Sequence, residues 1–377
     1  MRVSVICQPL ALLIDAHELD TAFLSRSVSN LTNVMRNQTH IMPDVAALIF
    51  DDCQASAVSS VIEALSVANL HWTSANSEDA PPFTWRTVSW NGRSVRTMAG
   101  LTLAAEASVD GVGSPDLIFV PAVRSDDSKA MGRSIQRLND VWGEFLRDHH
   151  ADHRYLAANC SANFLLAEAG LLDGRTATTS WWLTNSFRHA YPNVRLAPEM
   201  LVTRDSRIFC AAAFSACLNL GIEIVAEFLG PRAALSCARV MLVDINRAMQ
   251  LPYANMQEQV QHGDDLVLRA QSLIVSNMKH PMRLDKLADK LRVTSRTLNR
   301  RFKAATGETP LEYLQKSRVE LARHLLERTN LSFDQVVLRV GYEDASSFRR
   351  LFKRATSISP MEYRQRFSLR ERGSVQR

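Results

Sequence analysis

A repeat near the C-terminus constrains the fold of this chain more than any other feature. The segments Phe302–Tyr313 and Phe352–Tyr363 share Phe, Lys, Ala, Thr, Pro, Glu and Tyr at an offset of 50 residues. Upstream, Leu284–Leu291 matches Phe333–Val340 at an offset of 49 residues. One residue of slippage in a turn accounts for the difference, so we predict that the same supersecondary unit occurs twice.

Each copy has the pattern of a helix, a tight turn and a second helix. Apolar residues at i, i+3, i+4 and i+7 give the first helix of each copy one apolar face. Thr294 and Asp344 stand where they can cap the second helices. A tight turn between two short helices is typical of a helix-turn-helix that reads DNA.

The second helices carry outward-facing stripes of side chains suited to DNA. Arginine can bond guanine bidentately, asparagine can bond adenine, and lysine can pair with phosphate. A solvated helix face normally mixes acidic and basic residues, whereas neither stripe contains an acid. We therefore predict that both stripes bind DNA: Arg296, Asn299, Arg300 and Lys303 in the first copy, and Ser346, Arg349, Arg350 and Lys353 in the second.

The distribution of charge along the chain agrees with a DNA partner. Residues 265–377 contain 24 Lys and Arg against 12 Asp and Glu, and the remaining residues contain 20 against 27. The C-terminal part thus carries +12 and the rest −7 within a total of +5. A basic module joined to an acidic one indicates that the C-terminal part meets a polyanion, although a merely solvated basic surface would have the same charge.

Residues 265–367 resemble the DNA-binding domain of the AraC/XylS regulators. The resemblance rests on the closing signature of that family, which stands here as Gly341 to Lys353 followed by Ser359 to Arg364. It implies seven helices, with a central helix near Leu311–Glu327 that holds the two readers in successive major grooves of DNA. We assign residues 265–370 to this all-α domain.

The chain from Pro43 onward has a different pattern, in which apolar strands alternate with helices. This alternation predicts an α/β fold with a parallel sheet covered on both faces. Strands are predicted at 45–50, 117–121 and 155–159, and helices at 55–70, 135–149 and 162–169. We assign 43–235 to this domain and 236–264 to a helical linker. Residues 1–42 are expected to form an extension outside the domain core, and Met42 is a candidate for the natural start.

The segment Ala157–Trp181 resembles the nucleophile elbow of the DJ-1/PfpI group of class I glutamine amidotransferase-like domains. Regulators that join such a domain to an AraC-type reader form a known architecture. In the enzymatic members a cysteine sits on the strand-to-helix turn, where backbone N–H groups favour a thiolate and an oxyanion. Cys160 occupies that turn in this chain.

The partners of a catalytic cysteine are changed in this chain. The residue after the elbow dipeptide is Ala162 rather than Gly, and Ser180 stands where such regulators usually have His. The acidic residue of the group aligns near Ala57, and the second strand ends at Ala122 in place of Gly. Turnover requires proton transfer, so we predict no catalytic residue and no enzyme activity. The alternative is a Cys160-dependent amidase or hydratase fused to a DNA reader.

A ligand site is expected beyond the carboxyl ends of the strands, as in other folds of this class. The resemblance implies a small effector, because relatives sense nitrogen-containing metabolites such as amino acids and betaines. A purely structural domain is the competing interpretation, and tryptophans such as Trp181 more often belong to a core. The candidate lining residues are Asp52, Cys53, Ala122, Val123, Cys160, Ser161, Ser180, Trp181 and Phe214.

Other functional classes find little support in the sequence. The six cysteines have no zinc-type spacing, so we predict neither a metal nor a cofactor. His149, His150 and His153 are interpreted as surface residues. No apolar run approaches the roughly 20 residues of a membrane span, and the N-terminus lacks a clean signal peptide.

The sequence thus predicts a cytoplasmic, ligand-responsive transcription regulator. Its expected partners are promoter DNA, a small-molecule effector, RNA polymerase and a second copy of itself.

Overall fold

The computed structural model describes residues 42–75, 81–124, 128–245, 248–254, 263–280 and 282–368. The prediction that residues 1–42 form an extension falls almost wholly outside these residues and stays a prediction.

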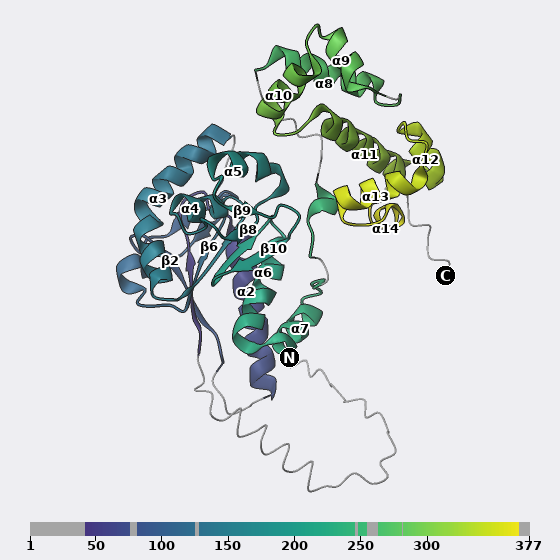
Figure 1. The fold of residues 1–377 in the computed structure, drawn as a ribbon. Helices are drawn as coiled ribbons and strands as arrows, with labels where there is room; N and C mark the ends of the chain where they lie inside the picture. The colour runs from purple at the N-terminus through teal and green to yellow at the C-terminus, as the bar shows by residue number, and fades with distance from the viewer. Residues whose placement is uncertain are drawn as a thin grey trace, which may run out of the picture. The chain divides into compact units, whose positions relative to one another are not determined.

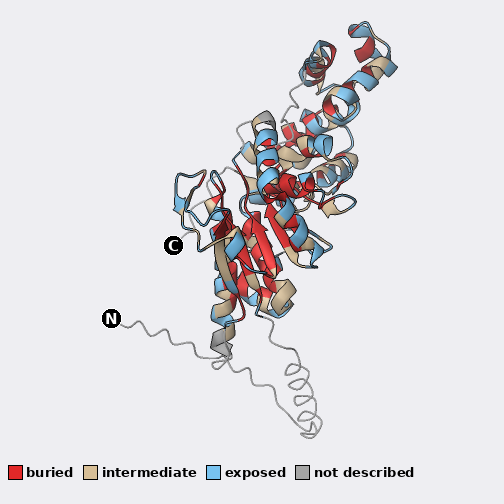
Figure 2. Cartoon of the chain, turned by 90° about the vertical axis from the view of Figure 1, so that its left-hand side faces the viewer, coloured by how far each residue is buried: buried red, intermediate tan, exposed pale blue. Residues whose placement is uncertain are grey.

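A seven-stranded sheet forms the centre of the first domain (Figure 1). Its strand order is β10-β11-β7-β6-β1-β2-β5, and its strands pair in parallel except β10 with β11 at one edge. The central strands are buried (Figure 2), as expected for a parallel sheet covered on both faces. The strands are β1 (Asp44–Leu48), β2 (Thr84–Ser89), β5 (Ala107–Ser108), β6 (Leu117–Val120), β7 (Tyr155–Asn159), β10 (Val202–Asp205) and β11 (Ile208–Ala211).

Helices cover both faces of this sheet. Helices α2, α6 and α7 pack together on one face, and α3 packs with α4 on the other. The helices are α2 (Ala55–Ala75), α3 (Ser128–Ala151), α4 (Ala162–Glu168), α5 (Thr184–Ala190), α6 (Ala216–Leu229) and α7 (Pro231–Val240). Shorter elements are β3 (Val95–Arg96), β4 (Thr102–Leu103), β8 (Thr176–Ala177), β9 (Arg195–Leu196), η1 (Val109–Gly111) and η2 (Trp181–Leu183). The predicted α/β fold with a mostly parallel sheet is confirmed.

The packing of the α/β domain continues past the predicted boundary at residue 235. That boundary falls inside α7, whose Cys237 and Ala238 belong to the same hydrophobic core as the sheet. The described residues after α7 do not form the predicted helical linker. They include an isolated bridge between Met200 and Met249 and a single 3-10 turn, η3 (Leu251–Tyr253).

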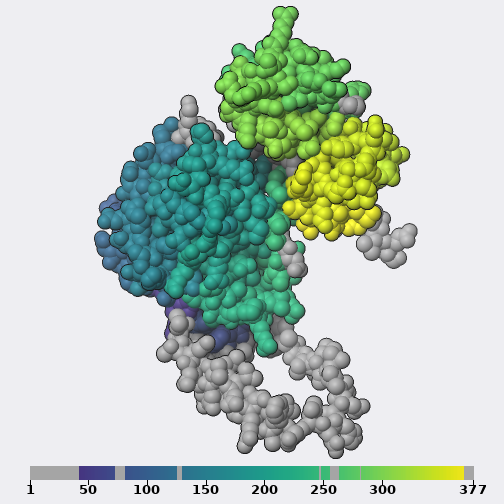
Figure 3. Space-filling view, viewed as in Figure 1, coloured from purple at the N-terminus to yellow at the C-terminus, as the bar shows by residue number. Residues whose placement is uncertain are grey.

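The C-terminal region is all-α and has two cores. Its described residues, 263–280 and 282–368, hold seven helices: α8 (Asp265–Asn277), α9 (Leu284–Lys290), α10 (Ser295–Thr306), α11 (Pro310–Arg328), α12 (Phe333–Arg339), α13 (Ala345–Thr356) and α14 (Pro360–Phe367). Helix α11 supplies Leu314 to the first core and Val319 and Leu326 to the second. The helices around the two cores appear in Figure 3 as a green and a yellow lobe. Two helix-turn-helix units joined by a central helix are therefore present, as predicted.

The residues that the two repeats share are those that form the turn after α10 and the turn after α13. Thr306 donates to the Phe302 carbonyl at 2.7 Å, and Thr356 donates to the Phe352 carbonyl at 2.8 Å. Each helix is then followed by a residue in the left-handed conformation, Gly307 in the first repeat and Ser357 in the second. A capping box and a proline begin the next helix in both. The repeated sequence thus encodes one turn geometry used twice.

Candidate DNA-binding surface and ligand site

The two reader helices, α10 and α13, are fixed by the same pair of local interactions. Each begins with a side-chain cap, in which Thr294 accepts from one backbone N–H and Asp344 from two. Each buries one face, made of Leu298, Phe302 and Thr306 in α10 and of Phe348, Phe352 and Thr356 in α13. The opposite face of each helix is therefore turned to solvent.

All eight residues of the predicted DNA stripes lie on these outward faces. Seven of them are exposed and Asn299 is half-buried. In the second stripe, the Arg350 guanidinium donates to the Ser347 hydroxyl at 3.0 Å, and the Arg349 guanidinium lies 5.0 Å from the ring centre of Phe333. These contacts orient both arginines without neutralising them.

Arg301 lies beside the first stripe but is occupied by another partner. Its guanidinium donates to both carboxylate oxygens of Asp264, at 2.8 and 2.6 Å. The same carboxylate caps α8, and the arginine holds the pKa of Asp264 below its usual range. This pair ties α10 to the start of α8, so Arg301 has a structural role beside the stripe.

The two helix-turn-helix units are also locked to each other. The buried Arg318 of α11 donates to the carbonyls of Met278 and His280, at 2.7 and 2.9 Å, just after α8. Gly341, in the turn of the second unit, has a φ of +83°, and a Cβ there would lie 2.7 Å from backbone atoms of Lys279. The turn of the second unit therefore rests directly on the backbone of the first, which fixes the spacing of the readers. The sequence offered no sign of the role of Arg318.

In the α/β domain, Cys160 has the geometry of a nucleophile elbow. It stands between β7 and α4 with a φ of +53°, a left-handed conformation that a residue with a side chain rarely adopts. Its N–H donates to the Ala211 carbonyl at 2.9 Å. The side chain is only 6% exposed, so a ligand that reaches the sulfur has to displace part of the surrounding wall.

The surroundings of Cys160 favour the neutral thiol. The Ser180 hydroxyl lies 2.7 Å from the Ala212 carbonyl oxygen and 2.9 Å from the Cys160 sulfur. A carbonyl can only accept, so the single hydroxyl proton goes to Ala212 and the thiol proton is left to point at Ser180. Burial raises the pKa of the Cys160 thiol. The position aligned with the acid of the family is Ala57, which is buried in α2.

Most of the predicted ligand-site residues meet at the carboxyl ends of β1, β6 and β7. Cys53 pairs with Val123 in an isolated bridge, and the Ser161 hydroxyl lies 2.8 Å from the Val123 carbonyl and 3.0 Å from its N–H. Ala122 is buried beside them. The outliers are Asp52, which is exposed, and Phe214, which lies just before α6 and is 53% exposed. Those two residues are weaker candidates than the rest.

Trp181 and two residues outside the prediction complete the wall beside Cys160. Trp181 is half-buried and packs edge-on against Trp182 at 5.3 Å. The Thr179 hydroxyl donates to the Cys160 carbonyl at 3.0 Å. The backbone N–H of Trp181 donates to the side-chain Oε1 of Gln250 at 3.0 Å. Sequence reasoning missed Gln250 because it lies 69 residues from its partner and outside any motif.

The interpretation of the histidine cluster as a surface feature is wrong for His149. This side chain is 7% exposed, and its Nε2 lies 3.0 Å from the Tyr155 carbonyl oxygen. Burial lowers the pKa of His149 to about 4. The end of α3 packs on β7, and that contact removes His149 from water. His153 is exposed and His150 is half-buried.

Comparison with known proteins assigns both parts of the chain. The DJ-1/PfpI family matches residues 44–227, and a helix-turn-helix domain matches residues 287–366. The chain joins a DJ-1/PfpI domain to an AraC-type helix-turn-helix domain. No helix among the described residues is both long enough and apolar enough to span a membrane.

Similar proteins include transcription regulators, two of which match this chain over most of their length. The regulator CdhR of Pseudomonas aeruginosa is 26% identical over 81% of this chain and 86% of its own, and GbdR of the same species is 23% identical over 85% and 84%. The activator RhaS of Escherichia coli is 40% identical over 22% of this chain and 29% of its own. Among solved structures, an AraC family regulator from Pseudomonas putida is 19% identical and covers 53% of this chain and 99% of its own, with a TM-score of 0.42.

Proposed function

We propose that this protein is a sequence-specific DNA-binding transcription regulator whose DJ-1/PfpI domain binds a small metabolite without turning it over. The observation that carries the proposal is the matched pair of reader helices. Each is capped, buries one apolar face, and presents on the opposite face a stripe of basic and neutral polar side chains that contains no acidic residue. DNA is the polyanion whose groove edges and phosphates such stripes recognise.

The contacts between the two units support a single mode of binding. Arg318 and the close approach at Gly341 hold α10 and α13 at one spacing. A rigid pair of readers fits two successive major grooves on one face of DNA, about 34 Å apart. The arginines and Asn299 are the candidates for base contacts, and Lys303 and Lys353 are the candidates for phosphate contacts.

The test uses DNA that the protein itself selects from a random duplex library. Arg300→Ala and Arg350→Ala should each weaken binding to the selected duplex by about 1–3 kcal/mol and relax the base preference at the contacted position. Arg133→Ala, exposed on α3 of the other domain, is the matched control for loss of one positive charge. Unchanged affinity in both reader variants refutes the proposed placement of α10 and α13.

The sensing role is supported by the closed, neutral elbow. The wall of Ser180 and Trp181 stands where a catalytic base would act, and Cys160 keeps its proton. A small effector, nitrogen-containing as in the relatives that the sequence resembles, would bind at the strand ends. It would favour one arrangement of the protein over another and so change affinity for DNA or for RNA polymerase. Two protomers are proposed to pair.

The competing function is a Cys160-dependent amidase or hydratase, which the strained elbow favours. It is tested with purified protein on simple amides, nitriles and aldehydes, with Cys160→Ser as control. Turnover by the wild type that disappears in Cys160→Ser would establish enzyme activity and refute the proposed sensing function. The effector is sought among the substrates and products of enzymes encoded by genes that flank the selected DNA sites.

A further inference from the structure

The segment Ala248–Ala254, here called the strap, begins inside the α/β domain. The Ala248 carbonyl accepts from the Leu201 N–H at 2.8 Å, and Met249 pairs with Met200. The N–H of Gln250 then donates to the Glu199 carbonyl at 2.9 Å. The first three residues of the strap therefore lie along the 199–201 segment of the domain as a short added strand.

The side chain of Gln250 is buried in the wall beside Cys160. It is 2% exposed. Its Nε2 donates to the Thr179 carbonyl at 2.7 Å and lies 3.2 Å from the Met200 carbonyl, while its Oε1 accepts from the Trp181 N–H. Thr179 in turn donates to the Cys160 carbonyl. A ligand that pushes this wall aside to reach the sulfur acts directly on the hydrogen bonds of Gln250.

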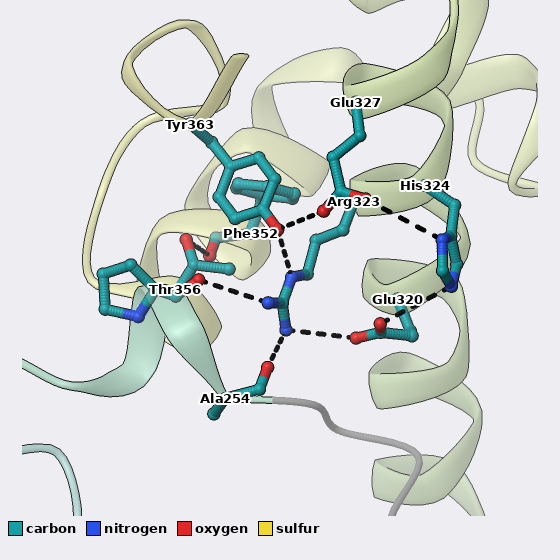
Figure 4. Close-up of polar contacts among 9 residues, drawn as sticks. Ala254, Glu320, Arg323, His324, Glu327, Phe352, Thr356 and Tyr363 are labelled. Atoms are coloured by element: carbon teal, nitrogen blue, oxygen red, sulfur yellow. Dashed lines mark hydrogen bonds and ion pairs between the residues drawn. The ribbon is translucent and has the colours of Figure 1, made fainter. Parts of the chain in front are cut away.

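The second half of the strap lies on the second helix-turn-helix unit (Figure 4). Arg323 of α11 donates to the carbonyls of Ala254 and Pro252, the latter at 3.2 Å. The Tyr253 ring packs edge-on against Phe367 of α14, with 5.1 Å between ring centres. The same 3-10 turn contacts α13, the second reader helix.

Arg323 makes the strap part of the core of that unit. It is 6% exposed, and it also donates to Glu320 at 3.1 Å and to the Tyr363 hydroxyl at 2.7 Å (Figure 4). Tyr363 donates to Glu327 at 2.6 Å. A buried guanidinium that loses two carbonyl partners leaves N–H groups unsatisfied. Movement of the strap therefore disturbs the hydrogen bonds that join α11 to α14, and Tyr363 of this network packs against Phe352 of α13.

One residue separates the two anchor points. Gln250 is bonded to the wall beside Cys160, and Pro252 is bonded to Arg323. Consecutive Cα atoms are about 3.8 Å apart, so such a connection spans less than about 8 Å and has no slack. We propose that the strap transmits the state of the elbow site to the second helix-turn-helix unit. This inference rests on the proposed function, and it names the segment through which that function is regulated.

The first experiment uses the full chain without DNA or ligand and measures amide hydrogen exchange. Gln250→Ala should raise exchange about fivefold at Thr178–Leu183 and also at Glu320–Glu327 and Pro360–Phe367, the change expected from loss of one ordinary hydrogen bond. Gln136→Ala, exposed on α3, is the matched control and should change none of these peptides. A rise in Gln250→Ala that stays within Thr178–Leu183 overturns the proposal.

A second variant tests the strap from its other end. Tyr253 is 39% exposed and belongs to none of the hydrophobic cores. Tyr253→Ala should therefore leave the cores intact even if Gln250→Ala unfolds the α/β domain, which faster exchange in β6 would reveal. We expect Tyr253→Ala to raise exchange at Thr178–Leu183 with no change in β6. Unchanged exchange at Thr178–Leu183 in this variant overturns the proposal.

A third measurement separates the strap from the proposed function. Coupling between two sites is reciprocal, so the duplex selected by the wild type should change exchange at Thr178–Leu183 in the wild type and not in Gln250→Ala. If the duplex binds and the wild type shows no such change, the proposed coupling through the strap is refuted, while the DNA-binding function is supported. If the wild type selects no DNA, the proposed function fails, and the DNA-free exchange still decides whether the strap couples its two ends.

Discussion

Replacing Gly341 tests whether the two helix-turn-helix units are held at one spacing. In Gly341→Ala the new Cβ meets the carbonyl carbon and oxygen of Lys279 at 2.7 Å, and these backbone atoms cannot rotate away. Ordinary contact begins at 3.4 Å, so the two backbones must separate by about 0.7 Å. That movement strains the hydrogen bonds from Arg318 to the carbonyls on either side of Lys279.

Gly307 supplies a matched control because it has nearly the same backbone conformation without a neighbour. Its φ is +79°, against +83° at Gly341, and a Cβ there would meet nothing within 4 Å. A left-handed alanine costs about 1–2 kcal/mol at either position. Loss of a hydrogen bond to a charged group costs about 1.5–3 kcal/mol. We therefore expect unfolding free energy to fall by about 1–2 kcal/mol in Gly307→Ala and by about 3–5 kcal/mol in Gly341→Ala.

Urea unfolding of the two variants measures this difference, and titration with the selected duplex measures its consequence. Gly341→Ala should bind the selected duplex more weakly than the wild type does, because the spacing of α10 and α13 no longer matches the two grooves. Gly307→Ala should bind the duplex as the wild type does. Equal losses of stability in the two variants would refute the claim that the close approach at Lys279 carries the spacing.

Three further predictions concern salt, acid and the elbow. Lys303→Ala and Lys353→Ala should weaken binding to all duplexes alike and reduce the slope of log affinity against log salt by about one unit each; an unchanged slope argues against phosphate contacts. The pKa of His149 is lowered to about 4 from 6.5, so the unfolded chain binds the proton first and stability should fall as pH drops from 6.5 to 4. The loss is up to about 3 kcal/mol and should be absent in His149→Gln, which keeps a donor for the Tyr155 carbonyl; equal acid sensitivity of both proteins contradicts this. Cys160→Ser should fold and bind DNA, and Cys160→Trp should fill the elbow site and abolish effector response with DNA affinity intact; normal response in the tryptophan variant places the ligand elsewhere.

The sequence predicts elements well where one local pattern determines them. Strands β1, β6 and β7 are short apolar runs because both of their faces are buried. The reader helices could be predicted from their capping residues, their apolar spacing and the repetition of the sequence. Strand β2 was not predicted, since only its last two residues are buried and it mixes polar with apolar side chains. The β10–β11 hairpin was also missed, because its turn uses Ser206 and Arg207 in left-handed conformations instead of Gly or Asn.

The residues that the sequence could not reveal act through contacts between distant segments. Gln250 is an isolated glutamine whose role exists only because the 178–181 turn lies against it. Arg323 and Arg318 look like ordinary basic residues of an amphipathic helix, yet both are buried and bonded to carbonyls outside α11. The boundary at 235 was placed too early for a similar reason, since the burial of α7 depends on α2 and α6.

The central claim is that α10 and α13 read DNA together, and footprinting on the selected duplex tests it most directly. The wild type should protect two stretches on one face, about 10 base pairs apart from centre to centre. Arg300→Ala should lose one stretch and keep the other, and Arg350→Ala should do the reverse. A single protected stretch that neither variant alters would contradict the account.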